Sequence, residues 1–402
     1  MSELSPIERD LIARIDPAPM LDQVLTWSAI NTGTRNLDGL ARQADLLAEA
    51  FGALPGKVTL EEVAPVEAVT ADGRAVAIAH GRHLVLHVRP QANRRFLLTG
   101  HMDTVFPADH PFQVARWLDD DTLNGPGVAD MKGGIAVILA ALTAFETSPA
   151  AAGVGYDVLI NADEEVGSLS SAPLIARLAA GKTAALTFEP SARPDGTLAG
   201  ARPGSGNYSV VIHGQSAHAG RNPEDGRNAI VAAAHLVIAL TDLAGPDISV
   251  NPAKIEGGSA NNVVPDLAIV RFNIRPRDEA AAARFAAALP GRIARIESQH
   301  GVHAHIHGGI SRPPKPLSED AEALFHLVRD CGAALGQTIG WQASGGVCDG
   351  NNIAACGVPV VDTMGVRGGA IHSPQEYLIV PSLHERAQLA ALVLHRLSGE
   401  VS

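Results

Sequence analysis

The sequence predicts an α/β fold, with a mixed and mostly parallel sheet flanked by helices and a smaller α+β domain inserted into the chain. The apolar run 158–160 ends in the three consecutive carboxylates 163–165, and a second run, 96–99, ends beside His101. Short apolar runs of this kind are typical of strands buried in a parallel sheet. Functional side chains in such sheets gather at the carboxyl ends of the strands, so both endings are candidate sites.

Helices with clear start signals precede these strands. Residues 5–8, Ser-Pro-Ile-Glu, have the form of a capping box with proline at the first helical position, and the Asp-Pro pair at 16–17 closes that helix. A second helix is predicted at about 19–28, and leucine and alanine recur at helical spacing over 37–48. Strand-like segments then follow over 58–88.

The middle of the chain changes character and predicts the inserted domain. Strand and helix patterns follow one another there in a β-α-β-α-β order, at 208–213, 227–243, 268–275, 278–299 and 302–307. Segments containing proline bound this region, so we predict a main domain formed by 1–202 and 313–402 and an inserted, ferredoxin-like domain at 203–312. The inserted domain is expected to serve as a lid or to form a dimer.

Composition and charge exclude several classes of protein. The 402 residues are 46% hydrophobic and carry a formal charge of -12, so they can form a substantial core and show no basic surface for nucleic acid. No apolar stretch approaches the ~20 residues of a membrane span, and the first residues lack the pattern of a signal peptide. We therefore expect a cytoplasmic protein with no nucleic-acid or membrane partner. Cys331, Cys348 and Cys356 show no CxxC spacing and are expected to be free thiols.

Polar residues with metal-binding or acid–base chemistry recur where predicted strands end. His101 and Asp103 are two apart and project to the same side of an extended chain. Asp130 lies in a glycine-rich loop that lacks both nucleotide-binding spacings, GxxxxGK[ST] and GxGxxG. Glu189 follows a further apolar run, and His372 is another candidate near the end of the chain. Each of these alone is more often a solvated turn or a hydrogen-bonded pair than a ligand, but their repetition favours one shared site.

Six motifs occur in the order typical of one enzyme family. They are Gly100-His101-Met102-Asp103-Thr104-Val105, the loop 127–134, Asp163-Glu164-Glu165-Val166-Gly167-Ser168, Phe188-Glu189-Pro190, Gln215-Ser216-Ala217-His218-Ala219-Gly220 and His372-Ser373-Pro374-Gln375-Glu376-Tyr377. Over about 32–402 the chain resembles the M20 metallopeptidases, and most of all their glutamate carboxypeptidase (carboxypeptidase G2-like) branch, which is related to acetylornithine and succinyl-diaminopimelate deacylases. The resemblance implies a zinc-peptidase-like main domain.

The resemblance also implies a centre with two zinc ions and five protein ligands. These ligands are His101, Asp130, Glu165, Glu189 and His372. Asp130 would bridge the two ions, and Co²⁺ or Mn²⁺ could take the place of zinc. Glu164 would be the general base that acts on a metal-activated water, and Asp103 would orient the His101 imidazole.

Contacts to substrate and to a second subunit are implied as well. His218 would reach the active site of the partner subunit in a homodimer, formed through the inserted domain, and stabilise the oxyanion. Asn262 and Arg312 would bind a substrate carboxylate. The chain departs from the family with Arg202, in the segment where a lysine contact is usual, and with Arg367, in a loop that is generally small and neutral. Both departures favour an acidic or polar portion of the substrate.

These residues favour a metal-dependent amidohydrolase. The resemblance implies hydrolysis of the amide bond in an N-acyl amino acid, in a small peptide, or in a conjugate of a C-terminal amino acid, with glutamate as one candidate. Two alternatives stay open. One is a dipeptidase or aminopeptidase of the same family, which would need a free substrate amine. The other is a binding protein that keeps the fold and has lost the chemistry.

Overall fold

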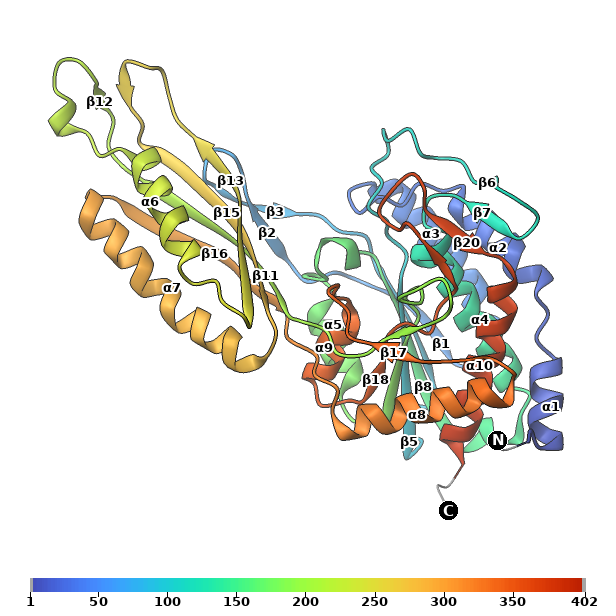
Figure 1. Ribbon diagram of the computed structural model, residues 1–402. Helices are drawn as coiled ribbons and strands as arrows, with labels where there is room; N and C mark the ends of the chain where they lie inside the picture. The colour runs from blue at the N-terminus through green and yellow to red at the C-terminus, as the bar shows by residue number, and fades with distance from the viewer. Residues whose placement is uncertain (1–2, 400–402) are drawn as a thin grey trace.

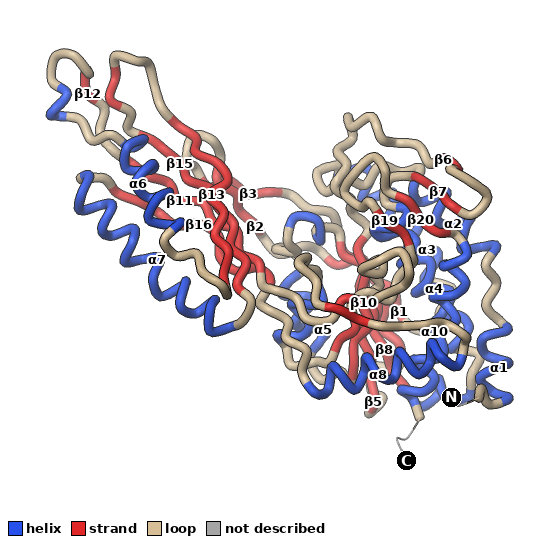
Figure 2. Tube along the Cα trace, viewed as in Figure 1, coloured by secondary structure: helices blue, strands red, loops and turns tan. Residues whose placement is uncertain are grey.

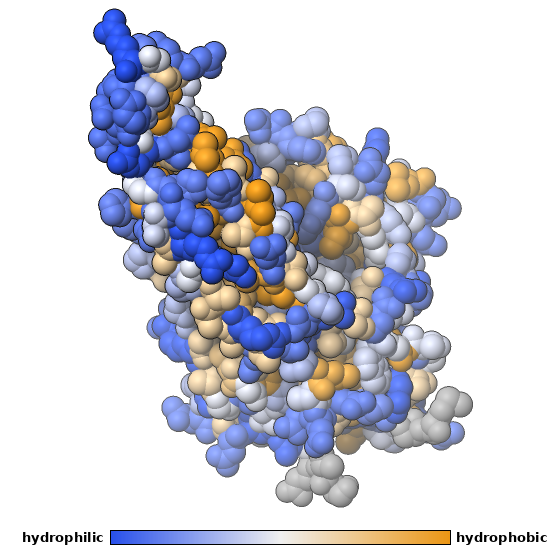
Figure 3. All heavy atoms as spheres, turned by 60° about the vertical axis from the view of Figure 1, so that its left-hand side comes forward, coloured by the Kyte–Doolittle hydropathy of each residue, from blue (hydrophilic) through white to orange (hydrophobic). Residues whose placement is uncertain are grey.

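The computed structural model describes residues 3–399, which form a main lobe and a smaller lobe that projects from it (Figure 1). The main lobe contains the first and last helices, and the small lobe consists mostly of residues from the middle of the chain. The space-filling view shows that the tip of the small lobe is largely hydrophilic (Figure 3).

A six-stranded sheet forms the centre of the main lobe, in the order β1-β4-β8-β5-β9-β18. Its strands are β1 (Lys57–Glu61), β4 (His83–Val88), β5 (Arg94–His101), β8 (Val154–Asn161), β9 (Ala184–Thr187) and β18 (Val360–Val361). Strands β8, β5, β9 and β18 pair in parallel, whereas β1 and β4 are antiparallel. The predicted mixed and mostly parallel sheet is confirmed, and the two apolar runs that predicted it, 96–99 and 158–160, lie side by side.

Helices cover both faces of this sheet, because alternate strand residues point to opposite sides. Leu84 and Leu86 face a large apolar core, and Val85 between them faces a smaller one. The large core includes residues of α1 (Pro6–Ala13), α2 (Ala18–Ser28), α3 (Leu37–Phe51), α4 (Gly133–Phe145), α8 (Glu319–Ala334) and α10 (Pro381–Ser398). The smaller core includes residues of α5 (Ala172–Ala179) and α9 (Asp349–Ala355).

A local sequence signal accounts for the start of α1. The predicted capping box is present, because Ser5 Oγ accepts a hydrogen bond from Glu8 N at 3.2 Å and Glu8 Oε2 accepts one from Ser5 N at 2.7 Å.

The apolar window Val128–Phe145 has the length and composition of a membrane span, but 89% of it is buried inside the protein. It contains α4, a core helix that packs against α10.

The small lobe has one more strand than the sequence predicted. Its elements follow a β-α-β-β-α-β order: β11 (Ser205–His213), α6 (Ala229–Thr241), β13 (Ile248–Gly257), β15 (Leu267–Pro276), α7 (Glu279–His300) and β16 (His303–Arg312). The antiparallel sheet order is β13-β15-β11-β16, which is the ferredoxin-like arrangement. The expected five-element order was wrong because β13 contains Pro252, which argues against a strand; β13 is an edge strand whose register shifts at this proline. The division of the chain at 202 and 312 stays a proposal.

A hairpin from the first part of the chain also reaches the small lobe. It consists of β2 (Val66–Val69) and β3 (Ala75–Ile78), and it lies on the face of the small sheet opposite α6 and α7 (Figures 1 and 2). Val69 packs there with Val211 and Ile269, and Arg271 Nη2 donates a hydrogen bond to Val69 O at 2.8 Å. The hairpin therefore links the lobes in addition to the two chain crossings beside β11 and β16.

Short strands complete the loops around the cleft and at the tip of the small lobe. One small sheet has the order β19-β20-β7-β6, with β6 (Arg116–Trp117), β7 (Thr122–Asn124), β19 (Gly368–Gly369) and β20 (Tyr377–Ile379). Two strand pairs are β10 (Leu198–Ala199) with β17 (Trp341–Gln342), and β12 (Ala217–His218) with β14 (Val263–Val264). The cysteines are free as predicted, with Cys331 and Cys348 buried and Cys356 exposed.

Candidate active site

Three neighbouring strands of the main sheet deliver side chains to one edge. His101 is the last residue of β5, Glu165 lies in a short helical turn after β8, and Glu189 follows β9. Strand β5 lies between β8 and β9 with parallel pairing on both sides. The carboxyl ends of all three strands therefore meet, as the strand-end argument predicted.

The five predicted ligands lie together at this edge. His101 Nε2 is 3.1 Å from Asp130 Oδ1 and 3.7 Å from Glu189 Oε2. His372 Nε2 is 3.2 Å from Asp130 Oδ2 and 3.2 Å from Glu165 Oε2. The two oxygens of Asp130 thus face two different imidazoles, as expected of a carboxylate that bridges two ions. Donor atoms lie within 4.8 Å of one another in two groups, His101 with Asp130 and Glu165, and His101 with Glu164 and Glu189.

A buried glutamate that sequence reasoning left without a role holds Asp130 in place. The Glu376 carboxylate accepts hydrogen bonds from the backbone N–H groups of Gly127, Ala129 and Asp130, at 3.2, 3.0 and 3.1 Å. Burial and the nearby Asp130 raise the pKa of Glu376 to about 8. Its position four residues after His372, within the same quoted motif, was the available signal.

Asp103 connects the first histidine to the acidic turn. Its backbone oxygen is 3.0 Å from His101 Nδ1, and its carboxylate accepts hydrogen bonds from Glu164 N at 3.1 Å and Glu165 N at 3.2 Å. Thr34 Oγ1 donates a further bond to it at 2.7 Å. Asp103 therefore positions both the imidazole and the turn that carries the two glutamates.

The three consecutive carboxylates have separate surroundings. Asp163 is fully buried and points away from the metal-ligand cluster, where it accepts hydrogen bonds from Ser170 Oγ at 2.8 Å and Ser171 Oγ at 2.6 Å. Backbone N–H groups of the same two serines also donate to it. Glu164 and Glu165 point into the metal-ligand cluster instead, and Glu164 also lines the cleft. Asp163 therefore anchors the turn, and the other two carboxylates are available for chemistry.

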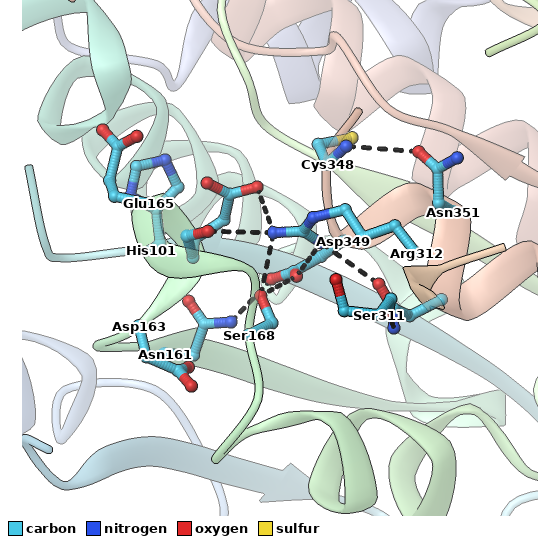
Figure 4. Close-up of polar contacts among 12 residues, drawn as sticks. His101, Asn161, Asp163, Glu165, Ser168, Ser311, Arg312, Cys348, Asp349 and Asn351 are labelled. Atoms are coloured by element: carbon cyan, nitrogen blue, oxygen red, sulfur yellow. Dashed lines mark hydrogen bonds and ion pairs between the residues drawn. The ribbon is translucent and has the colours of Figure 1, made fainter. Parts of the chain in front are cut away.

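Arg312 lies against Glu164 in the buried part of the site. Its Nη2 donates to Glu164 Oε1 at 2.6 Å and to Ser168 Oγ at 3.0 Å, and its Nη1 donates to Asp349 Oδ1 at 2.8 Å. Figure 4 shows dashed contacts that run from this guanidinium to the neighbouring side chains of Ser168 and Asp349, with His101 and Glu165 farther along the same site. Burial raises the pKa of Glu164 well above its usual range, although the Arg312 cation opposes that rise. The guanidinium is engaged by protein carboxylates here. The contact of Arg312 with a substrate carboxylate stays a prediction.

The remaining carboxylates fit a site for cations. Burial and the neighbouring Asp130 raise the pKa of Glu165 to about 7, and burial also raises the pKa of Glu189. Although burial opposes it, hydrogen bonds from His101 and His372 lower the pKa of Asp130. Carboxylates buried this close together resist joint ionisation unless positive charge offsets them. Imidazole and carboxylate donors are ligands that Zn²⁺ and related divalent ions accept.

The two other predicted contacts lie far from this edge within one chain. His218 is exposed in β12 at the tip of the small lobe (Figure 1), where its Nδ1 accepts a hydrogen bond from Gly220 N at 3.1 Å. Asn262 is also exposed there, and its backbone oxygen accepts a bond from Ala219 N at 2.9 Å. A single chain therefore does not bring His218 or Asn262 to the metal-ligand cluster.

A cleft of about 570 Å³ opens beside the ligands. Small residues of 342–347 and 368–371 form much of its wall, and Arg202 is the one arginine or lysine among the described residues that line it. Arg202 is bound to the buried Asp362 at 2.8 and 3.0 Å. Arg367 is bound to Glu385 at 3.0 Å. Both arginines already pair with carboxylates of the protein, and the expectation that they favour an acidic or polar portion of the substrate stays a prediction.

Comparison with known proteins agrees with the geometry. Residues 97–396 match the family model of Peptidase family M20/M25/M40. The chain is 28% identical over 376 residues to carboxypeptidase G2 of Pseudomonas sp. (strain RS-16), covering 91% of this chain and 86% of the relative. It is 30% identical over 309 residues to the succinyl-diaminopimelate desuccinylase of Halorhodospira halophila (strain DSM 244 / SL1), covering 72% and 79%.

Solved structures show the same fold at lower identity. The aminopeptidase PepT from Bacillus cereus ATCC 10987 superposes with a TM-score of 0.72 at 20% identity, covering 96% of this chain and all of that one. The YXEP protein of Bacillus subtilis, described as a dinuclear metal binding peptidase from the M20 family, superposes with a TM-score of 0.66 at 15% identity, covering 95% and 98%. With the match over 97–396 and the ligand cluster at the sheet edge, the chain belongs to Peptidase family M20/M25/M40 and is a metal-dependent hydrolase.

Proposed function

We propose that the protein is a dinuclear zinc amidohydrolase that releases an amino acid from an N-acyl amino acid or a C-terminal amino-acid conjugate. One observation carries the proposal: five metal-capable side chains from separate parts of the sequence converge beside one buried glutamate, Glu164, at the edge of a cleft. A binding protein that had lost its chemistry would have no need to retain both the ligand set and this carboxylate.

Zinc is the proposed metal because the ligands are two imidazoles and three carboxylates, and Co²⁺ or Mn²⁺ suits the same set. His101 and Glu189 would hold one ion and Glu165 and His372 the other, with Asp130 between them. When bound, the two cations would polarise the scissile carbonyl and lower the pKa of the attacking water to about 7.

The protein's own groups would move the proton. Glu164 would take a proton from the attacking water and deliver it to the leaving nitrogen. Arg312, 2.6 Å from Glu164 Oε1, limits the orientations that this carboxylate can adopt. The Asp103 carboxylate holds the turn in place by accepting hydrogen bonds from the backbone N–H groups of Glu164 and Glu165.

The substrate class follows from the relatives and from the cleft. Two relatives are named as a carboxypeptidase and a succinyl-diaminopimelate desuccinylase, and an amide bond next to an amino-acid portion is a bond that suits both kinds of activity. The cleft has room for a small acyl group or side chain, and its walls are mostly small residues. These observations support an N-acyl amino acid or a short blocked peptide.

Release of free amine from a panel of N-acyl amino acids tests the proposal. We expect turnover by the zinc-loaded protein, loss of turnover after chelation, and its return with Zn²⁺. The same dipeptides with blocked and unblocked amino termini provide the matched comparison. Faster cleavage of the unblocked peptides would replace the proposal with a dipeptidase or aminopeptidase, and no turnover of either set with two zinc ions bound would contradict it.

We also propose that His218 acts in a homodimer, on the carbonyl oxygen bound in the partner subunit's cleft. Support comes from its exposure at the tip of a lobe that projects from the main lobe, because a single chain leaves it remote from its own ligand cluster. Mixing chains that carry Glu164→Gln with chains that carry His218→Ala tests this. If the histidine acts between subunits, mixed dimers regain about a quarter of wild-type activity, since half of the dimers are mixed and each has one complete site. Activity that stays at the level of the separate variants would exclude that arrangement.

A further inference from the structure

The small lobe carries a second group of histidines, unrelated to the cleft. His303 and His305 lie two apart on β16, and His213 lies on β11 in direct register with His303. Side chains two apart on a strand project to the same face, and directly paired residues on neighbouring strands do so as well. The three imidazoles therefore share one face of the small sheet.

Packing identifies that face. Ala304, between the two histidines of β16, packs on the core under α6 and α7, so its neighbours point the other way. Val211, two residues before His213, packs with Val69 of the hairpin on the side without helices. The histidines therefore lie on the helix-free face, beside the hairpin β2–β3.

The three side chains are exposed, and their ring nitrogens are available to a ligand. The rings of His213 and His305 are 5.9 Å apart between centroids, with an interplanar angle of 63°. His213, His303 and His305 are all exposed, and within residues 3–399 none of their ring nitrogens takes part in a hydrogen bond or ion pair. An exposed side chain can change from one staggered rotamer to another, so the three imidazoles can turn toward one another when an ion binds.

We propose that His213, His303 and His305 form a separate site for one divalent transition-metal ion, with Zn²⁺ as the occupant. A His-x-His pair on one strand with a third histidine on the next strand presents three nitrogen donors on one face. Zinc accepts three histidine ligands and completes its tetrahedron with water. Imidazole ligands also suit Cu²⁺ and Ni²⁺, so the donor set selects a class of ion.

His307 is not part of this site, although it continues the same alternation on β16. It pairs across the sheet with Ser209, to which Arg271 Nη1 donates a hydrogen bond at 3.0 Å. A guanidinium at this level of the sheet disfavours a second cation nearby. His307 is thus a matched control, because it has the same residue type on the same strand without the proposed function.

Metal bound to the three histidines would join β16, an edge strand, to β11 at their outer ends. Binding to the folded form alone stabilises it by mass action. The site would therefore strengthen the small lobe and leave hydrolysis in the main lobe unchanged. It does not depend on the proposed substrate or on the general base.

Zinc content of the full-length protein after equilibration with micromolar Zn²⁺ and gel filtration tests the site. We expect wild type and His307→Gln to retain one zinc per chain more than the double variant His303→Gln/His305→Gln. Hydrolysis per folded chain should be equal in all three, which shows that the variants fold and that the cleft metals are intact. Equal zinc content in wild type and double variant would overturn the proposal, and so would a loss in His307→Gln equal to that in the double variant.

A second measurement uses thermal unfolding. Added Zn²⁺ should raise the Tm of wild type and His307→Gln by more than it raises the Tm of the double variant, because all three share the cleft sites and differ only at the proposed one. The same rise in all three proteins would count against a third site.

Discussion

The two lobes place polar groups in opposite ways. In the main lobe, charged side chains are buried at or beside the carboxyl ends of the main-sheet strands, as with His101, Asp130 and Asp163. In the small lobe, the space between sheet and helices is filled by apolar side chains, and histidines and charged residues point outward. Burial of charge is costly unless each group finds a partner. The main lobe therefore needs a dense network of partners at its functional edge, whereas the core of the small lobe consists of apolar side chains.

That network has members with different tasks. Some carboxylates are candidates for metal or proton chemistry, and others only hold the first group in place. Asp163, Asp362 and Glu376 are buried at least as deeply as the proposed ligands His101 and Asp130, yet their partners are hydroxyls, backbone N–H groups or cations of the protein. Burial alone thus does not identify a catalytic group, and substitutions can separate the two kinds.

The largest expected effect is loss of turnover in Glu164→Gln. The amide keeps the size of the side chain and can still accept a bond from Arg312, but it cannot take a proton from water. We expect kcat to fall by about 10³-fold, within the range for loss of a general base. Zinc content, measured on the same samples, should stay at the wild-type level.

The matched control is the adjacent Glu165→Gln, which should lower zinc content as well as activity because this residue is a proposed ligand. If Glu164→Gln retained wild-type kcat, Glu164 would not be the base. If both variants lost zinc equally, the two glutamates would not differ in their tasks.

Arg312 tests the link between the lobes, because it ends β16 and pairs with two buried carboxylates, Glu164 and Asp349. Arg312→Leu leaves both without their cation, and we expect the free energy of unfolding to fall by about 3–5 kcal/mol. Urea denaturation measures this. The control, Arg329→Leu, removes an exposed partner of Asp330 and should cost at most about 1 kcal/mol. A similar small loss in both variants would show that the buried pairs are not needed for stability.

Asp163→Asn tests whether Asp163, a buried carboxylate of the acidic turn, has a structural role or takes part in the reaction. The amide can accept fewer of the bonds that Ser170 and Ser171 donate, so stability should fall by about 1–3 kcal/mol. The kcat of the folded fraction should change little, because this side chain points away from the ligand cluster. A drop in kcat comparable to that of Glu164→Gln, with zinc retained, would assign Asp163 to the reaction.

Local patterns in the sequence predicted the strand-end residues, but not the partners of buried groups. His101 and Glu165 follow apolar runs that parallel strands require, so their meeting at one edge was predictable. The pairing of Arg202 with Asp362, 160 positions away, depends on how β9, β18 and the connecting loops assemble. The hairpin β2–β3 was expected as strand-like sequence, but its contact with the small sheet depends on tertiary packing that alternation alone does not specify.

The smallest expected effect concerns Asp362, which lies buried between Arg202 and Lys315. Although burial opposes it, these cations lower its pKa below the ordinary value of 3.8. The unfolded chain therefore binds a proton at this position before the folded chain does, and stability must fall as pH decreases. The contribution is fully present above the unfolded pKa and is lost as pH falls through the folded pKa. Urea unfolding of wild type and Asp362→Asn should show a constant stability difference from neutral pH down to about 5, and a smaller one below about 4, because protonated Asp362 resembles the amide. A difference that stays constant below pH 4 would mean that the two cations do not hold Asp362 ionised.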